Sequence, residues 1–229
     1  KLRDFLSSAF RKARESRSSS CSVIVNSFMT DSISAQELIS IASESANSGL
    51  YRYELYKSSK DESNIDELMI VIDNDDFSES SESLYKYVSY GESIGQSVNL
   101  ARDLSNGPPN HMTPTRLSEV ATETLLGTII NVEVMDIEKM ETMGMGALLG
   151  VARGSAEPPK FIVMDYIGDK DDPNNSIALL GKGITFDSGG LDLKSPTGMR
   201  TMKGDMAGGA AVIGAMNSIA YLKPKINVL

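Results

Sequence analysis

One stretch of the sequence decides the fold and carries its most unusual chemistry: Ile177-Ala-Leu-Leu-Gly-Lys-Gly-Ile-Thr-Phe-Asp-Ser-Gly-Gly-Leu-Asp-Leu-Lys194. It opens with a short apolar run, 177–180, which predicts a buried strand, and it continues into a loop that is rich in glycine. Glycine lets the backbone adopt positive φ or approach a ligand closely, although a long loop can also need glycine simply to turn. Because ligands collect at the carboxyl ends of strands in open parallel sheets, this loop is a candidate binding site.

The residues after the loop predict a crossover between parallel strands. Residues 206–221 have a helical pattern, and residues 226–229 are typical of a short strand. A strand, a helix and a second strand in this order fold as a right-handed parallel crossover. With further strands expected at 131–135 and 161–166, we predict an α/β fold whose central sheet is mostly parallel and flanked by helices.

The residues before this sheet predict a smaller, partial α/β domain. Helical patterns cover residues 2–13 and 33–57, with Gly49 as a weak point in the second. Short strands are expected at 23–25 and 68–72, and the continuous apolar run of 68–72 is typical of a strand buried on both faces.

A long helix is expected to connect the two parts of the chain. Apolar residues recur at helical spacing from Leu84 to Leu104, and Gly91 and Gly95 would allow close packing against a neighbour. The acidic, serine-rich residues before this helix, including the run 73–76, are the best candidate boundary. We therefore divide the chain into a partial N-terminal α/β domain, a connecting helix and the N-terminal part of a catalytic domain: 1–77, 78–105 and 106–229.

The amino-acid composition restricts the kinds of binding and catalytic site that the chain can form. The 229 residues carry a formal net charge of −9, which argues against broad, salt-driven binding of nucleic acid. No apolar run approaches the ~20 residues that cross a bilayer, so we expect no membrane partner, and no secretory signal pattern is present. The single cysteine, Cys21, and the single histidine, His111, exclude sites built from several of either residue. Any site must use carboxylates, lysines and backbone.

Such residues cluster in and after the glycine-rich loop: Lys182, Asp187, Asp192, Lys194 and Asp205. Carboxylate oxygens suit hard or borderline divalent cations, and a neutral amine can also bind one. Simpler alternatives exist, since Asp205 could be an ordinary N-cap of the following helix and Lys194 a solvated surface lysine. Spacing alone leaves these alternatives open.

Three longer blocks of sequence indicate the function more specifically than residue type and spacing do. They are Asn106-Gly-Pro-Pro-Asn110 with Thr113-Pro114, Met145-Gly-Ala-Leu-Leu-Gly-Val-Ala-Arg-Gly-Ser155 with Pro158-Pro159, and Gly181-Lys-Gly-Ile-Thr-Phe-Asp-Ser-Gly-Gly190 followed by Met202-Lys-Gly-Asp-Met206. Through these blocks, residues 106–229 resemble the leucyl aminopeptidase family, the two-metal cytosol aminopeptidases. The last block is long and specific to the family. Before residue 80 the similarity is weak and depends on the order of helices and strands.

The resemblance implies a role for each matching residue. Lys182 and Asp205 would bind one metal ion, and Asp187 would bridge two. Lys194 would be the catalytic lysine that polarises the scissile carbonyl and stabilises the developing oxyanion. Met202 would line the pocket for the substrate's first side chain.

The resemblance also implies cofactors and partners. The cofactors would be two divalent metal ions, zinc or manganese, with magnesium or cobalt as further candidates. The substrates would be peptides with an apolar, leucine-like N-terminal residue. The family usually assembles as a hexamer, so the full-length protein would be a homo-hexamer.

One departure from the family is serious. Its second signature, Asn-Thr-Asp-Ala-Glu-Gly-Arg, supplies two more metal-binding carboxylates and an arginine that holds a bicarbonate acting as base, and it does not occur in these residues. We therefore expect a fragment that lacks the C-terminal part of the catalytic domain, binds metal weakly and hydrolyses nothing alone. Rapid hydrolysis of an aminoacyl-p-nitroanilide with added manganese or zinc would contradict this expectation.

Two other functions stay open. A structural or regulatory paralogue would keep the fold and lose the metals, although it would have no need of the lysines and aspartates retained here. A binding module for an anion or nucleotide could instead use the glycine-rich loop at the strand end.

Overall fold

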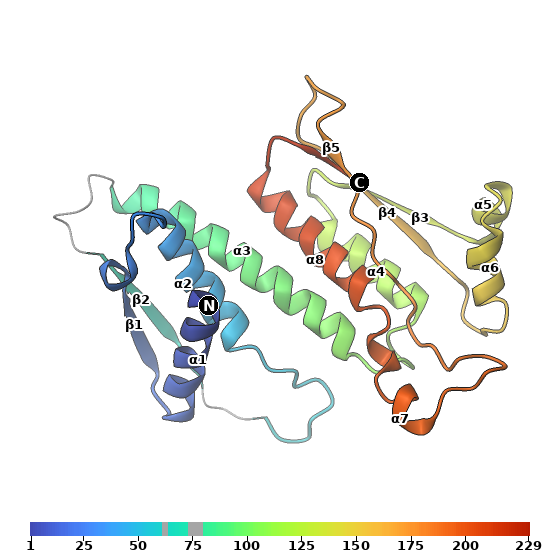
Figure 1. Cartoon of the computed structure of the whole chain (residues 1–229), viewed down its shortest axis with the longest axis horizontal. Helices are drawn as coiled ribbons and strands as arrows, with labels where there is room; N and C mark the ends of the chain where they lie inside the picture. The colour runs from blue at the N-terminus through green and yellow to red at the C-terminus, as the bar shows by residue number, and fades with distance from the viewer. Residues whose placement is uncertain (61–63, 73–79) are drawn as a thin grey trace. The chain divides into compact units, whose positions relative to one another are not determined.

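The computed structural model describes three ranges of the chain: 1–60, 64–72 and 80–229. The chain divides into two compact units, residues 1–99 and 100–229 (Figure 1). The acidic run 73–76, which we expected near a domain boundary, lies outside the described residues. None of the described helices is both long enough and apolar enough to cross a bilayer.

The first unit packs helices on a two-stranded parallel sheet. Its elements up to the second strand are α1 (Leu2–Glu15), β1 (Ser20–Ile24), the 3-10 helix η1 (Val25–Phe28), α2 (Ala35–Gly49) and β2 (Glu67–Val71). One cluster of its core combines buried residues from both helices and from β1: Leu6, Phe10, Val23, Ala42 and Ala46. The second helix begins with a capping box, in which Ser34 and Glu37 satisfy each other's backbone N–H groups.

Two expectations for this unit were wrong in detail. The helix expected over 33–57 ends at Gly49, where the sequence had its weak point. The second strand is not buried on both faces, because Met69 and Val71 are 45% and 43% exposed. Its burial alternates along the strand, as in a sheet that helices cover on one face only.

The long helix α3 (Ser81–Asn106) covers the predicted 84–104 and continues from the first unit into the second. Its glycines pack closely against α2, as the sequence predicted. A Cβ atom on Gly91 would lie 2.8 Å from the Cβ of Ser43, and one on Gly95 would lie 2.5 Å from the Cβ of Asn47. The Ser43 hydroxyl also donates a hydrogen bond of 2.9 Å to a carbonyl of α3.

The second unit contains a four-stranded sheet in the order β3-β4-β6-β5. Its strands are β3 (Asn131–Met135), β4 (Phe161–Ile167), β5 (Ser176–Ile177) and β6 (Asn227–Val228). The sheet is mixed, and our prediction of a mostly parallel sheet was wrong: β4 is antiparallel to both β3 and β6, and only β5 and β6 are parallel. The connection from β4 to β5 spans only residues 168–175, which is too short for a crossover, so the chain must reverse there.

The reversal after β4 is fixed by the buried carboxylate of Asp169. Its Oδ2 accepts from Asn175 Nδ2 at 3.0 Å, and its Oδ1 accepts from the amides of Asp171 and Asp172, both at 3.3 Å. The side chain of Asn227 in β6 bonds to the Asp169 backbone at both its N–H and its carbonyl. The hydrogen bond from Asn175 is the main reason why the pKa of Asp169 lies below its ordinary value.

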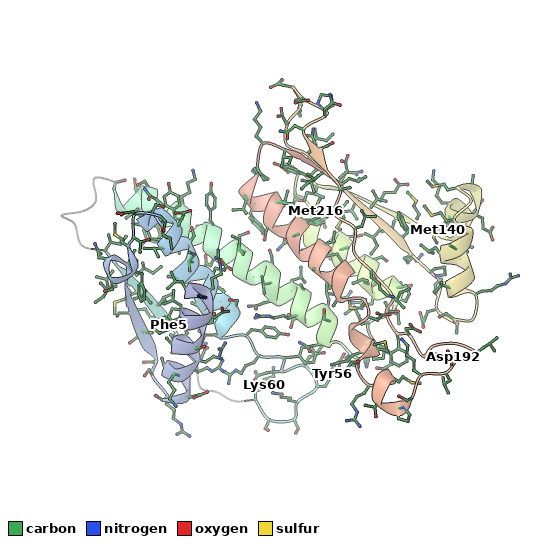
Figure 2. All side chains as sticks on the ribbon, in the orientation of Figure 1. Phe5, Tyr56, Lys60, Met140, Asp192 and Met216 are labelled. Atoms are coloured by element: carbon green, nitrogen blue, oxygen red, sulfur yellow. The ribbon has the colours of Figure 1, made fainter. Side chains whose placement is uncertain are left out.

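Helices cover this sheet and form the core. The helices are α4 (Pro114–Leu125), α5 (Ile137–Thr142), α6 (Gly146–Ala152), α7 (Pro196–Met199), the 3-10 helix η3 (Met202–Gly204) and α8 (Ala207–Leu222). The largest core cluster joins α4 and α8 to strands β4 and β6, and Figure 2 labels its buried Met216 on α8. The Thr113 side chain caps α4, and β5, α8 and β6 form the predicted crossover between parallel strands. The helices α5, α6 and α7 were not foreseen from the sequence.

Candidate metal centre

The glycine-rich loop leaves the sheet beside the start of α8. The strand expected over 177–180 is shorter, but the Leu179 N–H still donates to the Leu229 carbonyl at 2.7 Å and keeps the chain next to β6. At Gly181 the loop meets the first turn of α8 backbone to backbone. A Cβ atom on Gly181 would lie 2.7 Å from Gly209 Cα, whereas one on Gly183 would meet no atom within 4 Å. This contact fixes the backbone position of residue 182, which lies between the two glycines.

That residue is Lys182, and it is held at both its backbone and its side chain. Its carbonyl accepts a hydrogen bond of 2.7 Å from the Gly209 N–H, one of the amides that open α8. Its Nζ lies 3.5 Å from Asp205 Oδ2, which is an ion pair. The loop and the helix start therefore bring an amine and a carboxylate together.

Asp205 is not an ordinary helix cap. The N-cap position of α8 is Met206, and no side chain caps it. The Oδ2 atom of Asp205 is buried and, within the described part of the chain, has no hydrogen-bond partner. The Lys182 ammonium, 3.5 Å away, offsets its charge without a hydrogen bond, so the oxygen keeps lone pairs that a cation could take.

Asp187 and Lys194 form the second ion pair of the loop. Lys194 Nζ lies 2.7 Å from Asp187 Oδ2 and 2.9 Å from the sulfur of Met202. The other carboxylate oxygen of Asp187 accepts from the Gly189 N–H at 2.7 Å. Gly189 has a φ of +96°, which only glycine adopts readily, so the turn that presents this N–H requires glycine.

The two ion pairs are neighbours. Hydrogen bonds from Lys194 and then from Gly189 are the main reasons why the pKa of Asp187 is below its ordinary value, and the positive charge of Lys182 lowers it further. Asp187 thus stays ionised between two lysines. By contrast, Asp192 lies on the exposed part of the loop (Figure 2), where the sequence analysis left it without a role.

The donors fit a divalent cation in their chemistry. The carboxylates of Asp187 and Asp205 offer the oxygens that such ions prefer, and Lys182 offers an amine that can bind once it has lost its proton. These two carboxylates belong to no larger metal-binding group, because the described residues contain no cluster of three or more His, Cys, Asp or Glu suited to a metal.

Sequence reasoning gave no role to three residues that hold the site. Gly208 and Gly209 form the helix start that contacts the loop, and Lys203 donates from its Nζ to the Asn106 carbonyl at 3.0 Å. The signal was present, since the glycine pair 208–209 follows Asp205 after two residues and Lys203 stands inside the block that resembles the family. The sequence alone does not indicate which distant residues the glycine pair and Lys203 contact.

The fold and the site define a class of protein: a mixed α/β domain that gathers lysines and aspartates in a loop after a sheet strand. Residues 99–229 match the catalytic domain of the cytosol aminopeptidase family, which is more than half of the chain. The chain belongs to the cytosol aminopeptidase family.

Solved structures agree with this assignment. One, described as the bottromycin maturation enzyme BotP in complex with Mn, shares 29% identity and a TM-score of 0.80, and the match covers 100% of this chain and 46% of that chain. A mutant of tomato leucine aminopeptidase shares 28% identity and a TM-score of 0.81, covering 99% of this chain and 43% of that chain. The chain thus spans a little under half the length of these similar proteins.

Proposed function

We propose that residues 181–205 contribute part of the metal centre of an aminopeptidase that removes N-terminal residues from peptides. The observation that carries this proposal is the convergence of Lys182 with Asp205 and of Lys194 with Asp187 at one strand end. Membership of the cytosol aminopeptidase family supports it. A structural paralogue would not need a buried carboxylate oxygen that faces a lysine but has no hydrogen-bond partner among the described residues.

Each side chain has a distinct task in this proposal. Asp187, Asp205 and Lys182 hold the cations, which we propose to be two manganese or zinc ions, with magnesium and cobalt as further candidates. Bound cations supply positive charge and Lewis acidity to the reacting peptide group. The resemblance gives Asp187 the bridging position between them.

Lys194 is proposed as the catalytic lysine. Asp187 fixes its Nζ at 2.7 Å, so that a positive donor is already oriented before a substrate arrives. Such a preorganised donor stabilises negative charge that develops on the scissile carbonyl oxygen. Met202 contacts the same Nζ, and its flexible thioether suits an apolar, leucine-like first side chain.

The organisation of the whole protein is also a proposal. We propose that residues 106–229 are the N-terminal part of the catalytic domain, that 78–105 form a connecting helix and that 1–77 form a partial N-terminal α/β domain. A homo-hexamer, peptide partners and a cytoplasmic location follow from the family resemblance.

Manganese titration of the 229-residue chain by calorimetry tests the metal centre. The matched variants are Asp187→Asn in the cluster and Asp192→Asn on the exposed loop, which make the same chemical change five residues apart. We expect the wild-type chain and Asp192→Asn to bind manganese equally, and Asp187→Asn to bind at least tenfold more weakly, in line with the typical loss when a metal site is perturbed. Equal binding by all three would contradict the proposal.

A parallel titration with inorganic phosphate tests the remaining alternative. Phosphate binding without manganese binding would favour an anion-binding module that uses the glycine-rich loop. Binding of neither ion would favour a paralogue that has lost the metals.

A further inference from the structure

The short turn η3 joins two parts of the candidate site. It begins at Met202, whose sulfur contacts Lys194, and it is followed directly by Asp205, which pairs with Lys182. The positions of both residues therefore depend on how this turn is held.

The turn itself packs only partly. Its three residues are half-buried, and the nearest fully buried residue is Met206, two positions beyond the turn. Its own hydrogen bonds are local: the Gly204 N–H donates to the Thr201 carbonyl at 3.0 Å, and the Asp205 N–H donates to the Met202 carbonyl at 3.2 Å. Isolated 3-10 turns of this kind have poor hydrogen-bond geometry and need tertiary support.

Lys203, in the middle of the turn, supplies that support from a distant part of the chain. Its Nζ donates a hydrogen bond of 3.0 Å to the backbone carbonyl of Asn106, 97 residues away in the sequence. Figure 1 shows the C-terminal end of α3 near the segment that leads from α7 into α8.

The acceptor explains why a lysine stands there. Asn106 is the last residue of α3, and the final carbonyls of a helix have no partner within the helix. These carbonyls also form the negative end of the helix dipole, which favours a cation. A lysine satisfies both needs, and an apolar side chain of similar length, such as methionine, satisfies neither.

We infer that Lys203 is a positioning residue, which ties η3 to the end of α3 and thereby sets where Met202 and Asp205 present their side chains. This inference depends on the proposed metal centre, because the position of Asp205 matters only if Asp205 binds a cation. Lys203 itself contacts neither substrate nor metal in this assignment.

Two variants of Lys203 separate positioning from general stability. Lys203→Met keeps the aliphatic stem and removes the charged donor, whereas Lys203→Arg keeps a charged donor. Lys170→Met makes the same change at an exposed lysine of the loop between β4 and β5 and serves as the control. Manganese affinity of the full 229-residue chain is measured by calorimetry, with Asp187→Asn included.

We expect Lys203→Met to bind manganese about tenfold more weakly, as for other residues that orient metal ligands, and Lys203→Arg and Lys170→Met to bind as the wild-type chain does. If the wild-type chain binds manganese, Asp187→Asn does not and Lys203→Met binds normally, only this inference is overturned. If the wild-type chain binds no manganese, the proposed metal centre fails, and this inference fails with it.

Hydrogen exchange of the metal-free chain gives a second readout. We expect the amides of Gly204 and Asp205 to exchange faster in Lys203→Met, while the amides in the middle of α8 keep their wild-type rates. Equal exchange at the turn would overturn the positioning role. Faster exchange throughout α8 would also overturn it, because it would show that the substitution loosens the unit as a whole.

Discussion

The contact between the glycine-rich loop and the start of α8 gives the sharpest mutational prediction. In Gly181→Ala, the new Cβ atom would lie 2.6 Å from the carbonyl carbon of Gly208 and 2.7 Å from Gly209 Cα. Carbon atoms in contact normally lie about 3.5–4.0 Å apart, so the loop and the helix start must separate by about 1 Å. The atoms in the way are backbone, so a change of rotamer cannot relieve the contact.

This separation affects both folding and the site. Overpacking of this kind typically lowers the free energy of unfolding by about 1–3 kcal/mol. It also lengthens the 2.7 Å bond from the Gly209 N–H to the Lys182 carbonyl and moves Lys182 relative to Asp205. We therefore expect manganese affinity to fall about 10- to 100-fold, the usual range when the groups that orient metal ligands are disturbed.

Gly183→Ala is the matched control, because it lies on the other side of Lys182. Its Cβ atom would meet nothing within 4 Å, and its φ is not positive, so the backbone accepts alanine. Urea unfolding measures the stability of each variant, and calorimetric titration measures its manganese affinity. Equal manganese affinity in the two variants would refute the reasoning, as would an equal loss of stability.

Three further predictions concern the two units. Phe10→Ala should lower the free energy of unfolding by about 3–5 kcal/mol, since Phe10 is only 1% exposed. Phe5, labelled in Figure 2, is 59% exposed, so Phe5→Ala should change that free energy by less than about 0.5 kcal/mol. Similar losses for the two variants in urea unfolding, followed by circular dichroism, would contradict this prediction. Gly91→Ala should cost about 1–3 kcal/mol by the same measurement, because α2 leaves no room for a Cβ atom, and wild-type stability would show that the helices can separate freely. The pKa of Asp169 is lowered in the folded state, so its contribution to stability is present above the ordinary carboxyl pKa and is lost as pH falls through the folded value. In urea unfolding, Asp169→Asn should therefore be most destabilising near pH 7 and least destabilising at acid pH. The control Asp171→Asn, at an exposed side chain, should show a smaller difference, and a loss at Asp169→Asn that does not change with pH would contradict the assignment.

Much of the local structure could be predicted because the relevant signals are local. Strand β3 has the predicted bounds 131–135, and α3 covers the predicted helix 84–104, because apolar periodicity acts over a few residues. Gly91 was predicted to lie at a close helix contact, and it does. The family was also predicted correctly from the block that includes residues 181–190.

The direction of the strands could not be predicted in the same way. The mixed order of the sheet depends on the reversal at 168–175, which Asp169 and Asn227 hold through hydrogen bonds between residues far apart in the sequence. Nothing in the local pattern of β4 indicates which strand it will pair with. The burial of β2 was misjudged for a similar reason, because a continuous apolar run does not show how many layers cover it.

In the candidate site, too, the residues could be predicted from the sequence, but the contacts between them could not. The sequence picked out Lys182, Asp187, Lys194 and Asp205 by residue type and by resemblance, but their pairing comes only from the folded loop. The tether from Lys203 to Asn106 could not be foreseen, since its acceptor is a backbone carbonyl and every residue has one.

Anomalous diffraction from crystals of the 229-residue chain soaked in manganese tests the central claim most directly. Data collected at the manganese absorption edge locate the ion independently of any assay. Our account predicts an anomalous peak within bonding distance of carboxylate oxygens of Asp187 or Asp205, next to Lys182 Nζ. A well-occupied peak elsewhere in the molecule, with none between these residues, would contradict it.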